Sequence, residues 1–170
     1  MTMVYDTIPS PIGTLLLVGD STGLLHIDLP EARRPIARSA DWRRDEAAFA
    51  DARAQFDAYF AGTRQEFDLP LSPRGTDFQR RVWSALRAIG YGETISYAEL
   101  ARRVGNPRAS RAVGLANGAN PLSIVVPCHR VIGANGSLTG YGGGLAAKQW
   151  LLALEQARAP SVFALAAQAG

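Results

Sequence analysis

Cys128 is the only cysteine in this 170-residue chain, and one of its two histidines, His129, follows it directly. A thiol becomes a strong nucleophile as the thiolate, and a nearby imidazole favours that form. Neighbouring side chains usually diverge, so we expect a proton to pass between the two through a bridging water molecule. The pair therefore predicts nucleophilic chemistry at sulfur.

A third group should orient the imidazole, as a carboxylate does in hydrolytic triads. Glu155 is our candidate among the four acidic residues that follow residue 72. The alternative for the pair is purely structural: Cys128 would be a small buried residue and His129 a hydrogen-bonded one. Without wider sequence context, this structural alternative is the more common case.

The lone cysteine bears on where the protein works, because it cannot form a disulfide within the chain. Residues 1–6 show no basic region followed by an apolar one, so no signal peptide is visible. No apolar run approaches the ~20 residues that a membrane span needs. We therefore expect a cytoplasmic protein that keeps its thiol reduced.

Charge is divided unevenly along a chain whose formal net charge is +3. Residues 1–72 carry 7 arginines and 11 acidic residues, whereas residues 73–170 carry 10 arginines, one lysine and 4 acidic residues. A basic C-terminal half suggests contact with a polyanion. The alternative is that these charges are simply solvated, and charge alone does not decide between the two.

The elements that must position Cys128 fall into two groups, and the first is mainly strands. Short apolar runs separated by proline and glycine predict an antiparallel meander. A polar, arginine-rich loop follows, and then a helical apolar stripe that Gly62 ends. We expect strands over 3–8, 14–18 and 24–29, a helix over 45–61, an edge strand over 67–71, a linker over 72–75, and an N-terminal α/β domain over 1–72.

The second group is helical. Thr76 with Gln79 and Ser96 with Glu99 have the spacing of capping boxes, which predict helix starts. Gly105 ends the second of these helices, and Asn106-Pro107 can cap and start a third. We expect helices over 76–89, 96–105, 106–117 and 145–158, a C-terminal helical domain over 73–170, and an unassigned tail over 161–170.

The second and third of these helices have the length and spacing of a helix-turn-helix. The third is rich in small side chains, with Arg111 as its large polar exception. Small side chains let a helix axis approach a flat or grooved surface, and a single arginine can reach a phosphate or a base stack. DNA binding is one interpretation, and tight packing of an ordinary helix pair is the other.

Residues 126–131, Val-Pro-Cys-His-Arg-Val, decide between these alternatives. The stretch resembles the active-site signature of the O6-alkylguanine-DNA alkyltransferases, also called methylated-DNA–protein-cysteine methyltransferases. Further motifs match this family in order and spacing, and the resemblance is strongest between Gly75 and Glu155. The matching stretches are 91–97, 106–114, 120–121, 141–145 and 150–155.

The resemblance implies an α+β fold with a small N-terminal antiparallel sheet and a helix, ribonuclease H-like, followed by a helical domain with a winged-helix-like helix-turn-helix. It implies DNA repair in which Cys128 irreversibly takes the alkyl group, mainly methyl, from O6-alkylguanine in duplex DNA, with O4-alkylthymine as a second candidate substrate. The partner is duplex DNA contacted in the minor groove. We expect a monomer, with cooperative binding on DNA as a further prediction, and no cofactor.

The resemblance also implies catalytic roles. His129 deprotonates the Cys128 thiol through water, and Glu155 polarises His129. Asn120 supports this set from behind. Tyr97 contacts the flipped base or its backbone and protonates the departing guanine.

Further roles concern the DNA and the base pocket. Arg111 enters the duplex where the base leaves, and extruding that base costs roughly a few kcal/mol. Tyr141 packs on the guanine, while backbone groups of Cys128, Val131 and Gly142 read its edges. The remaining candidates for DNA contact are Ala109, Ser110 and Gly114, and Ser123 is a candidate for the pocket wall.

Three positions depart from the family pattern. His26 matches one ligand of a structural zinc found in some members, but no cysteine accompanies it, so we expect no metal and interpret His26 as a hydrogen-bonded strand residue. Gly142 stands where some members have serine, which leaves only the backbone N–H there. Ser123 replaces a proline at the pocket wall, and both changes bear on how large an alkyl group fits.

Two other classes of protein are the alternatives. A cysteine hydrolase would turn over repeatedly and would leave the helix-turn-helix unexplained. A helix-turn-helix regulator, or a protein that binds alkylated DNA without repairing it, would have no use for Cys128. The cysteine therefore favours the alkyl acceptor.

Overall fold

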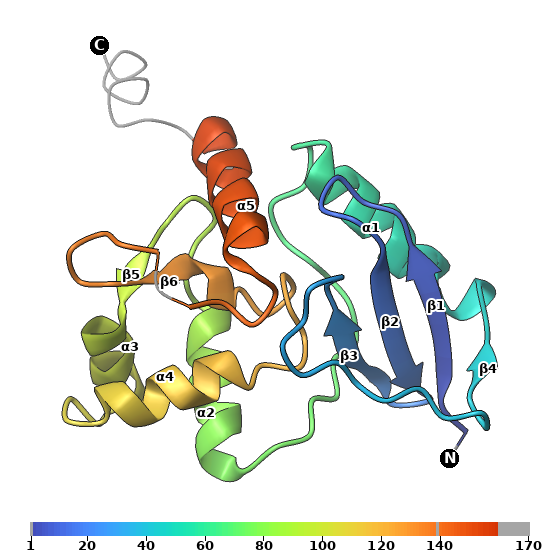
Figure 1. The fold of residues 1–170 in the computed structure, drawn as a ribbon, viewed down its shortest axis with the longest axis horizontal. Coiled ribbons are helices and arrows are strands. Elements are labelled where there is room, and N and C mark those ends of the chain that lie inside the picture. Colours follow the sequence, from blue (N-terminus) through green and yellow to red (C-terminus); the bar gives the residue numbers. More distant parts are fainter. Residues whose placement is uncertain (1, 139, 160–170) are drawn as a thin grey trace.

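The computed structural model describes residues 2–138 and 140–159, which form two lobes (Figure 1). Thr139, in the predicted glycine-rich turn, and the tail 161–170 lie outside the described residues. The first lobe is a sheet with strand order β3-β2-β1-β4, and α1 lies along one face of it. Its elements are β1 (Val4–Ile8), β2 (Leu15–Asp20), β3 (Gly23–Asp28), β4 (Arg43–Arg44), the 3-10 turn η1 (Ala47–Phe49) and α1 (Ala50–Phe60).

The predicted antiparallel meander is confirmed, because β1 pairs with β2 and β2 with β3 in antiparallel register. The second strand was expected to end at residue 18, but Gly19 and Asp20 still lie in β2. The reason is Asp20, whose Oδ1 accepts the Thr22 N–H at 2.8 Å and so fixes a turn at residues 20–23. The loop 30–44 also holds a short strand, β4, parallel to β1.

Two other N-terminal predictions need correction. The helix expected over 45–61 begins as the 3-10 turn η1, and α1 starts only at Ala50. The edge strand expected over 67–71 does not form, and its pairing is limited to a bridge between Leu71 and Leu24. Pro70 accepts the Leu24 N–H at 2.8 Å through its carbonyl but has no N–H of its own to continue a ladder.

The second lobe is mainly helical, and the predicted α+β architecture is confirmed. Its two short strands, β5 and β6, run parallel beside the helices. Within the described ranges, no helix is both long and apolar enough to cross a bilayer. The elements of the second lobe are α2 (Asp77–Arg87), β5 (Ile95–Ser96), α3 (Tyr97–Val104), α4 (Ser110–Gly118), the 3-10 turn η2 (Cys128–Arg130), β6 (Val131–Ile132) and α5 (Leu145–Arg158).

Capping explains where the first two helices begin. Thr76 caps α2 with the complete capping box: its Oγ1 accepts the Gln79 N–H at 3.1 Å, and Gln79 Oε1 accepts the Thr76 N–H at 3.0 Å. Only half of the second predicted box is present. Ser96 accepts the Glu99 N–H at 3.1 Å, but the Glu99 carboxylate binds Arg102 and Arg103 instead.

The third predicted helix begins later than expected, at Ser110 instead of Asn106. Gly105 has φ +91° and ends α3, and the Asn106 N–H bonds back to the Ala101 carbonyl at 3.0 Å. This is the left-handed C-terminal cap of a helix. Asn106 therefore belongs to the C-terminal cap of α3, and α4 starts four residues later, while α5 occupies the predicted residues 145–158.

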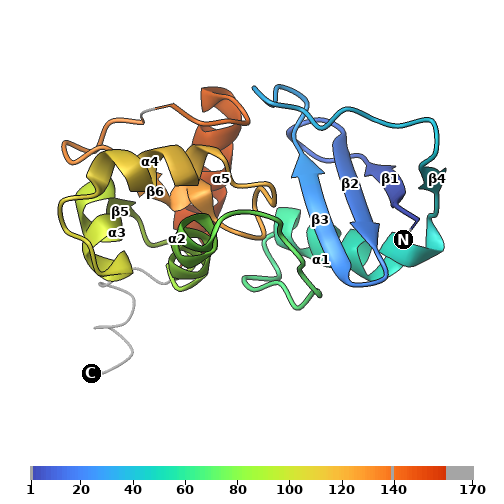
Figure 2. The ribbon, with the colours of Figure 1, turned by 90° about the horizontal axis from the view of Figure 1, so that it is seen from below.

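The two lobes share a hydrophobic core. Its buried members come from the sheet and α1 on one side and from α2, α3, α4 and the Cys128 loop on the other. The backbone joins the lobes where the Ile27 N–H donates to the Pro121 carbonyl at 2.8 Å. Helix α5 lies on the side of the C-terminal lobe that faces the N-terminal lobe, as Figures 1 and 2 both show. Glu155, on this helix, is thus placed at the junction.

A candidate active site around Cys128

Cys128 is the first residue of η2 and follows a tightly folded, buried loop. Within this loop the Val126 N–H donates to the Leu122 carbonyl at 2.9 Å, and the Cys128 N–H donates to the Val126 carbonyl at 2.8 Å. Ile124 has φ +75°, a left-handed conformation that is strained for a β-branched residue. Packing in the core holds it there, since its side chain is 2% exposed.

Two asparagines hold this loop from the α4 side. Asn120 donates to the Val126 carbonyl at 2.8 Å, and its Oδ1 accepts the Leu122 N–H at 3.0 Å. Asn117, for which no role was predicted, donates to the Cys128 carbonyl at 3.5 Å. Asn120 thus lies behind the reactive loop, and the preceding turn of α4 adds a second amide.

The environment of the Cys128 sulfur favours the neutral thiol. Burial raises the pKa of Cys128, while interactions with Asn120, Tyr141 and the charge of Lys148 oppose this rise without cancelling it. Only 7% of the residue is exposed. At neutral pH the sulfur is therefore mainly protonated, and it needs a base to become a nucleophile.

Lys148, on α5, is a charged neighbour that sequence reasoning missed. Its Nζ donates to the Val131 carbonyl at 2.7 Å and lies 6.0 Å from the centre of the Tyr141 ring. The residue is 1% exposed, and burial lowers the pKa of Lys148. Val131 and Tyr141 are buried as well, so a charged amine, an aromatic ring and the thiol share one interior region.

His129 and Glu155 meet inside the protein. His129 Nε2 and Glu155 Oε2 are 2.8 Å apart, and both residues are completely buried. Burial lowers the pKa of His129 despite the opposing charge of Glu155, so the imidazole is neutral at pH 7. A carboxylate can only accept, which makes Nε2 the N–H nitrogen. Nδ1 then carries the lone pair, and no side-chain or backbone group of the described residues bonds to it.

Glu155 receives further donors, and these were not foreseen. Arg130 donates from Nε to Oε1 at 2.8 Å and from Nη2 to Oε2 at 3.0 Å. The Tyr59 hydroxyl donates to Oε2 at 2.6 Å from the other lobe. Burial alone would raise the pKa of Glu155, but the bonds from His129 and Arg130 outweigh it and lower this pKa to about 2. Glu155 is therefore a carboxylate at any working pH.

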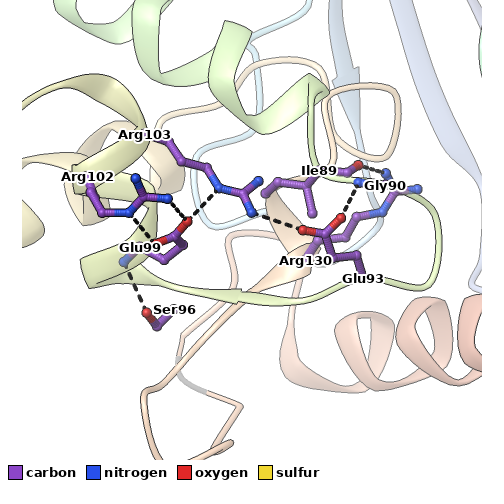
Figure 3. A network of polar contacts seen from close by, with 8 residues as sticks. All are labelled: Ile89, Gly90, Glu93, Ser96, Glu99, Arg102, Arg103 and Arg130. Atoms are coloured by element: carbon purple, nitrogen blue, oxygen red, sulfur yellow. Dashed lines mark hydrogen bonds and ion pairs between the residues drawn. The ribbon is translucent and has the colours of Figure 1, made fainter.

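Arg130 is itself fixed to the turn between α2 and β5. Its Nη1 donates to the Ile89 carbonyl at 2.6 Å, and Glu93 accepts the Gly90 N–H at 3.1 Å (Figure 3). Glu93 also pairs with Arg103 of α3 at 3.1 Å. The turn after α2 is thus bound on one side by Arg130, which pairs with Glu155, and is connected on the other side through Glu93 to Arg103 of α3.

The predicted DNA-contacting residues lie on α3 and α4. Arg111 is exposed on α4, whereas Ser110 and Gly114 are half-buried. Tyr97, the first residue of α3, packs over Gly114, where an added Cβ would lie 3.7 Å from the tyrosine ring. Ala109, directly before α4, is also half-buried. This distance is an ordinary van der Waals contact, so Tyr97 alone does not require glycine at position 114.

A cleft of about 860 Å³ runs between α4 and the N-terminal lobe. Asn120, Ser123, Gly142 and Gly114 line it, and His26 and Arg33 contribute from the opposite side. Two of the lining residues are joined directly, because the Arg33 backbone N–H donates to the Gly142 carbonyl at 2.7 Å. The lining does not include Cys128, Tyr97, Arg111, Val131 or Tyr141.

Side chains that could bind a metal ion are His, Cys, Asp and Glu. His26 contacts Asp28 at 2.6 Å on β3, which fits a hydrogen-bonded strand histidine. Over residues 2–138 and 140–159, no three His, Cys, Asp or Glu side chains are grouped to hold a metal ion. The donors near Cys128 instead bind one another.

Comparison with known proteins covers both lobes. Residues 3–73 match the family model described as 6-O-methylguanine DNA methyltransferase, ribonuclease-like domain, and residues 77–157 match the DNA binding domain of the same family. The first match confirms the predicted ribonuclease-like character of the N-terminal lobe.

Individual relatives are similar over nearly their whole length. The chain is 55% identical over 161 residues to the methylated-DNA–protein-cysteine methyltransferase of Mycobacterium bovis, covering 95% of this chain and 97% of that one. It is 52% identical over 153 residues to the protein of the same name from Methanosarcina acetivorans, covering 90% and 98%. The crystal structure of Mycobacterium tuberculosis OGT in complex with DNA superimposes with a TM-score of 0.86, at 54% identity, over 95% of this chain and 98% of that one.

Proposed function

The chain belongs to the 6-O-methylguanine DNA methyltransferase family, and from this premise we propose that it repairs alkylated DNA by taking the alkyl group onto Cys128. Its relatives are named as methyltransferases that act on a protein cysteine, and this chain has one cysteine. The carrying observation is that this buried cysteine directly precedes a histidine that pairs with a buried carboxylate. The reaction is DNA repair by alkyl transfer from O6-alkylguanine to the protein.

The proposed chemistry begins with the proton. His129 Nδ1 takes the Cys128 proton through a bridging water, and the Glu155 carboxylate stabilises the imidazolium that results. The low pKa of Glu155 suits this role, because the group is charged before the proton arrives. The raised pKa of Cys128 explains why a base is needed at all.

The transfer itself is a displacement at carbon. The Cys128 sulfur forms a bond to the alkyl carbon while the bond from that carbon to O6 breaks. The electron pair stays on the guanine, which takes up a proton, and Tyr97 is our candidate donor. The product is a thioether, which has no easy hydrolysis route, so each molecule of protein reacts once.

DNA is the partner, and we propose that α4 enters its minor groove. The support is the run of small residues on α4 with Arg111 exposed among them. Arg111 would fill the space that the base leaves when it is extruded from the duplex toward Cys128. The chain supplies every residue of the reacting set, so a monomer suffices, and cooperative binding along DNA stays a prediction.

Two further proposals concern the cellular compartment and the domain boundary. We place the protein in the cytoplasm, because an alkyl acceptor with a single thiol requires reducing conditions. The domain boundary at residues 72 and 73 also stays a proposal, and it is supported by the gap between residues 73 and 77 that separates the two family matches.

The test is to weigh the intact protein after incubation with duplex DNA that carries O6-methylguanine. We expect one added methyl group per molecule, located on the Cys128 peptide, and none on Cys128→Ala. Arg111→Ala should slow the reaction with duplex DNA at least tenfold, about 1.4 kcal/mol, and leave the reaction with free O6-methylguanine base unchanged. Arg108→Ala removes an equal charge before α4 and controls for charge loss.

Two results would contradict this proposal. An unchanged protein mass, or more than one methyl transferred per molecule, would exclude a single-use acceptor at Cys128. Equal losses for Arg111→Ala on duplex DNA and on the free base would exclude the insertion of Arg111 into the duplex.

A further inference from the structure

We propose that Tyr59, on the N-terminal lobe, is a positioning residue for alkyl transfer, whose hydroxyl fixes the Glu155 carboxylate so that His129 stays a neutral proton acceptor. The inference rests on the proposed function, because it assigns Tyr59 a part in the same proton transfer. It gives the N-terminal lobe a direct share in the chemistry of the C-terminal one.

The geometry places Tyr59 in contact with the reacting set. Tyr59 lies in the last turn of α1 and is 1% exposed. Its hydroxyl lies 2.6 Å from Glu155 Oε2, the same oxygen that His129 Nε2 meets at 2.8 Å. The two partners are 96 positions apart in the chain. One carboxylate oxygen thus joins the two lobes and the base.

The tyrosine ring has little freedom to move. Its centre lies 5.4 Å from that of Phe60, 5.2 Å from Phe67 and 6.3 Å from Tyr91. The ring packs in this buried aromatic cluster with its hydroxyl on Glu155, and close packing of the interior restricts its motion. The contact is therefore a built feature of the lobe junction.

The direction of the hydrogen bond follows from the charge states. Burial, the charge of Glu155 and the hydrogen bond to it all raise the pKa of Tyr59, so the phenol keeps its proton. Glu155 is a carboxylate and can only accept. Tyr59 therefore donates at every working pH.

This donation bears on His129 in two ways. First, Tyr59 holds Oε2 where Nε2 can donate to it, which keeps the lone pair of His129 on Nδ1. Second, it neutralises part of the charge on Oε2. Without the phenol, more of that charge would act on the imidazole, the pKa of His129 would rise, and less neutral base would be present at a given pH.

A purely structural clip between the lobes is the competing explanation. A clip would affect the melting temperature, but it would leave the pH dependence of alkyl transfer where it is. A positioning residue would move that pH dependence. The rate requires neutral His129 and rises with pH through its pKa, so a raised pKa moves this rise to higher pH.

The experiment is Tyr59→Phe in the full-length protein, compared with wild type and with Tyr91→Phe. Tyr91 is the matched control, because its hydroxyl is buried in the same cluster but bonds to none of the described residues. Single-turnover transfer from duplex O6-methylguanine is followed by protein mass between pH 5.5 and 9. We expect Tyr59→Phe to lower the rate at pH 7 about two- to tenfold, the equivalent of one hydrogen bond, and to shift the rise to higher pH.

A second measurement does not depend on the DNA. The chain has two histidines, so His129 can be followed by NMR of the imidazole nitrogens with His26 as an internal reference. We expect the pKa of His129 to rise in Tyr59→Phe and to stay unchanged in Tyr91→Phe. A variant that melts earlier but keeps the wild-type pH profile and the wild-type His129 pKa would overturn the inference.

The two proposals fail differently. If wild type transfers no methyl group, the proposed function is wrong. If wild type transfers it and Tyr59→Phe matches it in rate, pH profile and His129 titration, only the role of Tyr59 is wrong.

Discussion

Asp6 in the N-terminal lobe and Glu155 in the C-terminal lobe are both fully buried carboxylates that bind arginine, yet their surroundings differ. Asp6 accepts from Arg44 at 3.0 Å and from Arg53 at 2.7 Å, and these arginine side chains are 54% and 36% exposed. Glu155 binds Arg130, whose side chain is only 8% exposed, together with a histidine and a tyrosine.

The comparison teaches which buried carboxylate serves chemistry. Burial would raise the pKa of both groups, and hydrogen bonds overcome that effect in both, chiefly from Arg44 at Asp6 and from His129 and Arg130 at Glu155, so a lowered pKa does not separate them. The two carboxylates differ in the groups that they hold in place. Asp6 connects α1 and β4 to β1, whereas Glu155 orients the imidazole of His129, whose second nitrogen bonds to none of the described residues and which directly follows Cys128 in the chain.

The largest expected effect is that of Glu155→Gln, which tests the functional half of this comparison. The amide cannot stabilise an imidazolium as a carboxylate does, so the methyl transfer rate should fall at least ~100-fold. Arg130 would also be left as an unpaired buried charge, at a cost of about 3–5 kcal/mol. Single-turnover kinetics and urea unfolding measure the two losses, and a near-normal rate would remove Glu155 from the mechanism.

The next effect is on the pH dependence of stability, to which both carboxylates contribute. The pKa of Glu155 is about 2 in the folded protein, below the ordinary 4.5 of an unfolded chain. Its contribution is therefore complete above pH 4.5 and is lost as pH falls toward 2, at about 3 kcal/mol. Asp6 acts in the same direction. Urea unfolding between pH 6 and 3 should show the decline in wild type and a shallower one in Glu155→Gln.

The smallest effect is expected for Asp6→Asn, which tests the structural half. Arg44 and Arg53 can turn to solvent when the charge is removed, so the free energy of unfolding should fall by only about 1–3 kcal/mol. The transfer rate of the folded protein should equal that of wild type, because Asp6 contacts no group of the site. A specific loss of rate would erase the distinction between the two carboxylates.

Local patterns predicted much of the fold. Thr76 and Gln79 mark the start of α2, and α5 coincides with the helix expected over 145–158. Errors arose where one group has two possible partners. Asn106 finishes α3 instead of starting α4, and the carboxylate of Glu99 chooses arginines over its own helix cap.

The candidate site was only partly predictable for a related reason. Cys128, His129 and Glu155 could be proposed because the types of two neighbours and a family pattern pointed to them. Arg130 carried no separate signal although it adjoins His129, and Tyr59 carried none, since its contact depends on how two lobes pack. The roles of Arg111, Tyr97 and the base-pocket residues stay predictions.

The burial of Lys148 has a practical consequence for labelling this protein. It is the chain's one lysine, and its amine is 2.7 Å from a backbone carbonyl inside the fold. Reagents that attack amines will therefore find no lysine on the folded surface, and modification of Lys148 by such a reagent reports unfolding.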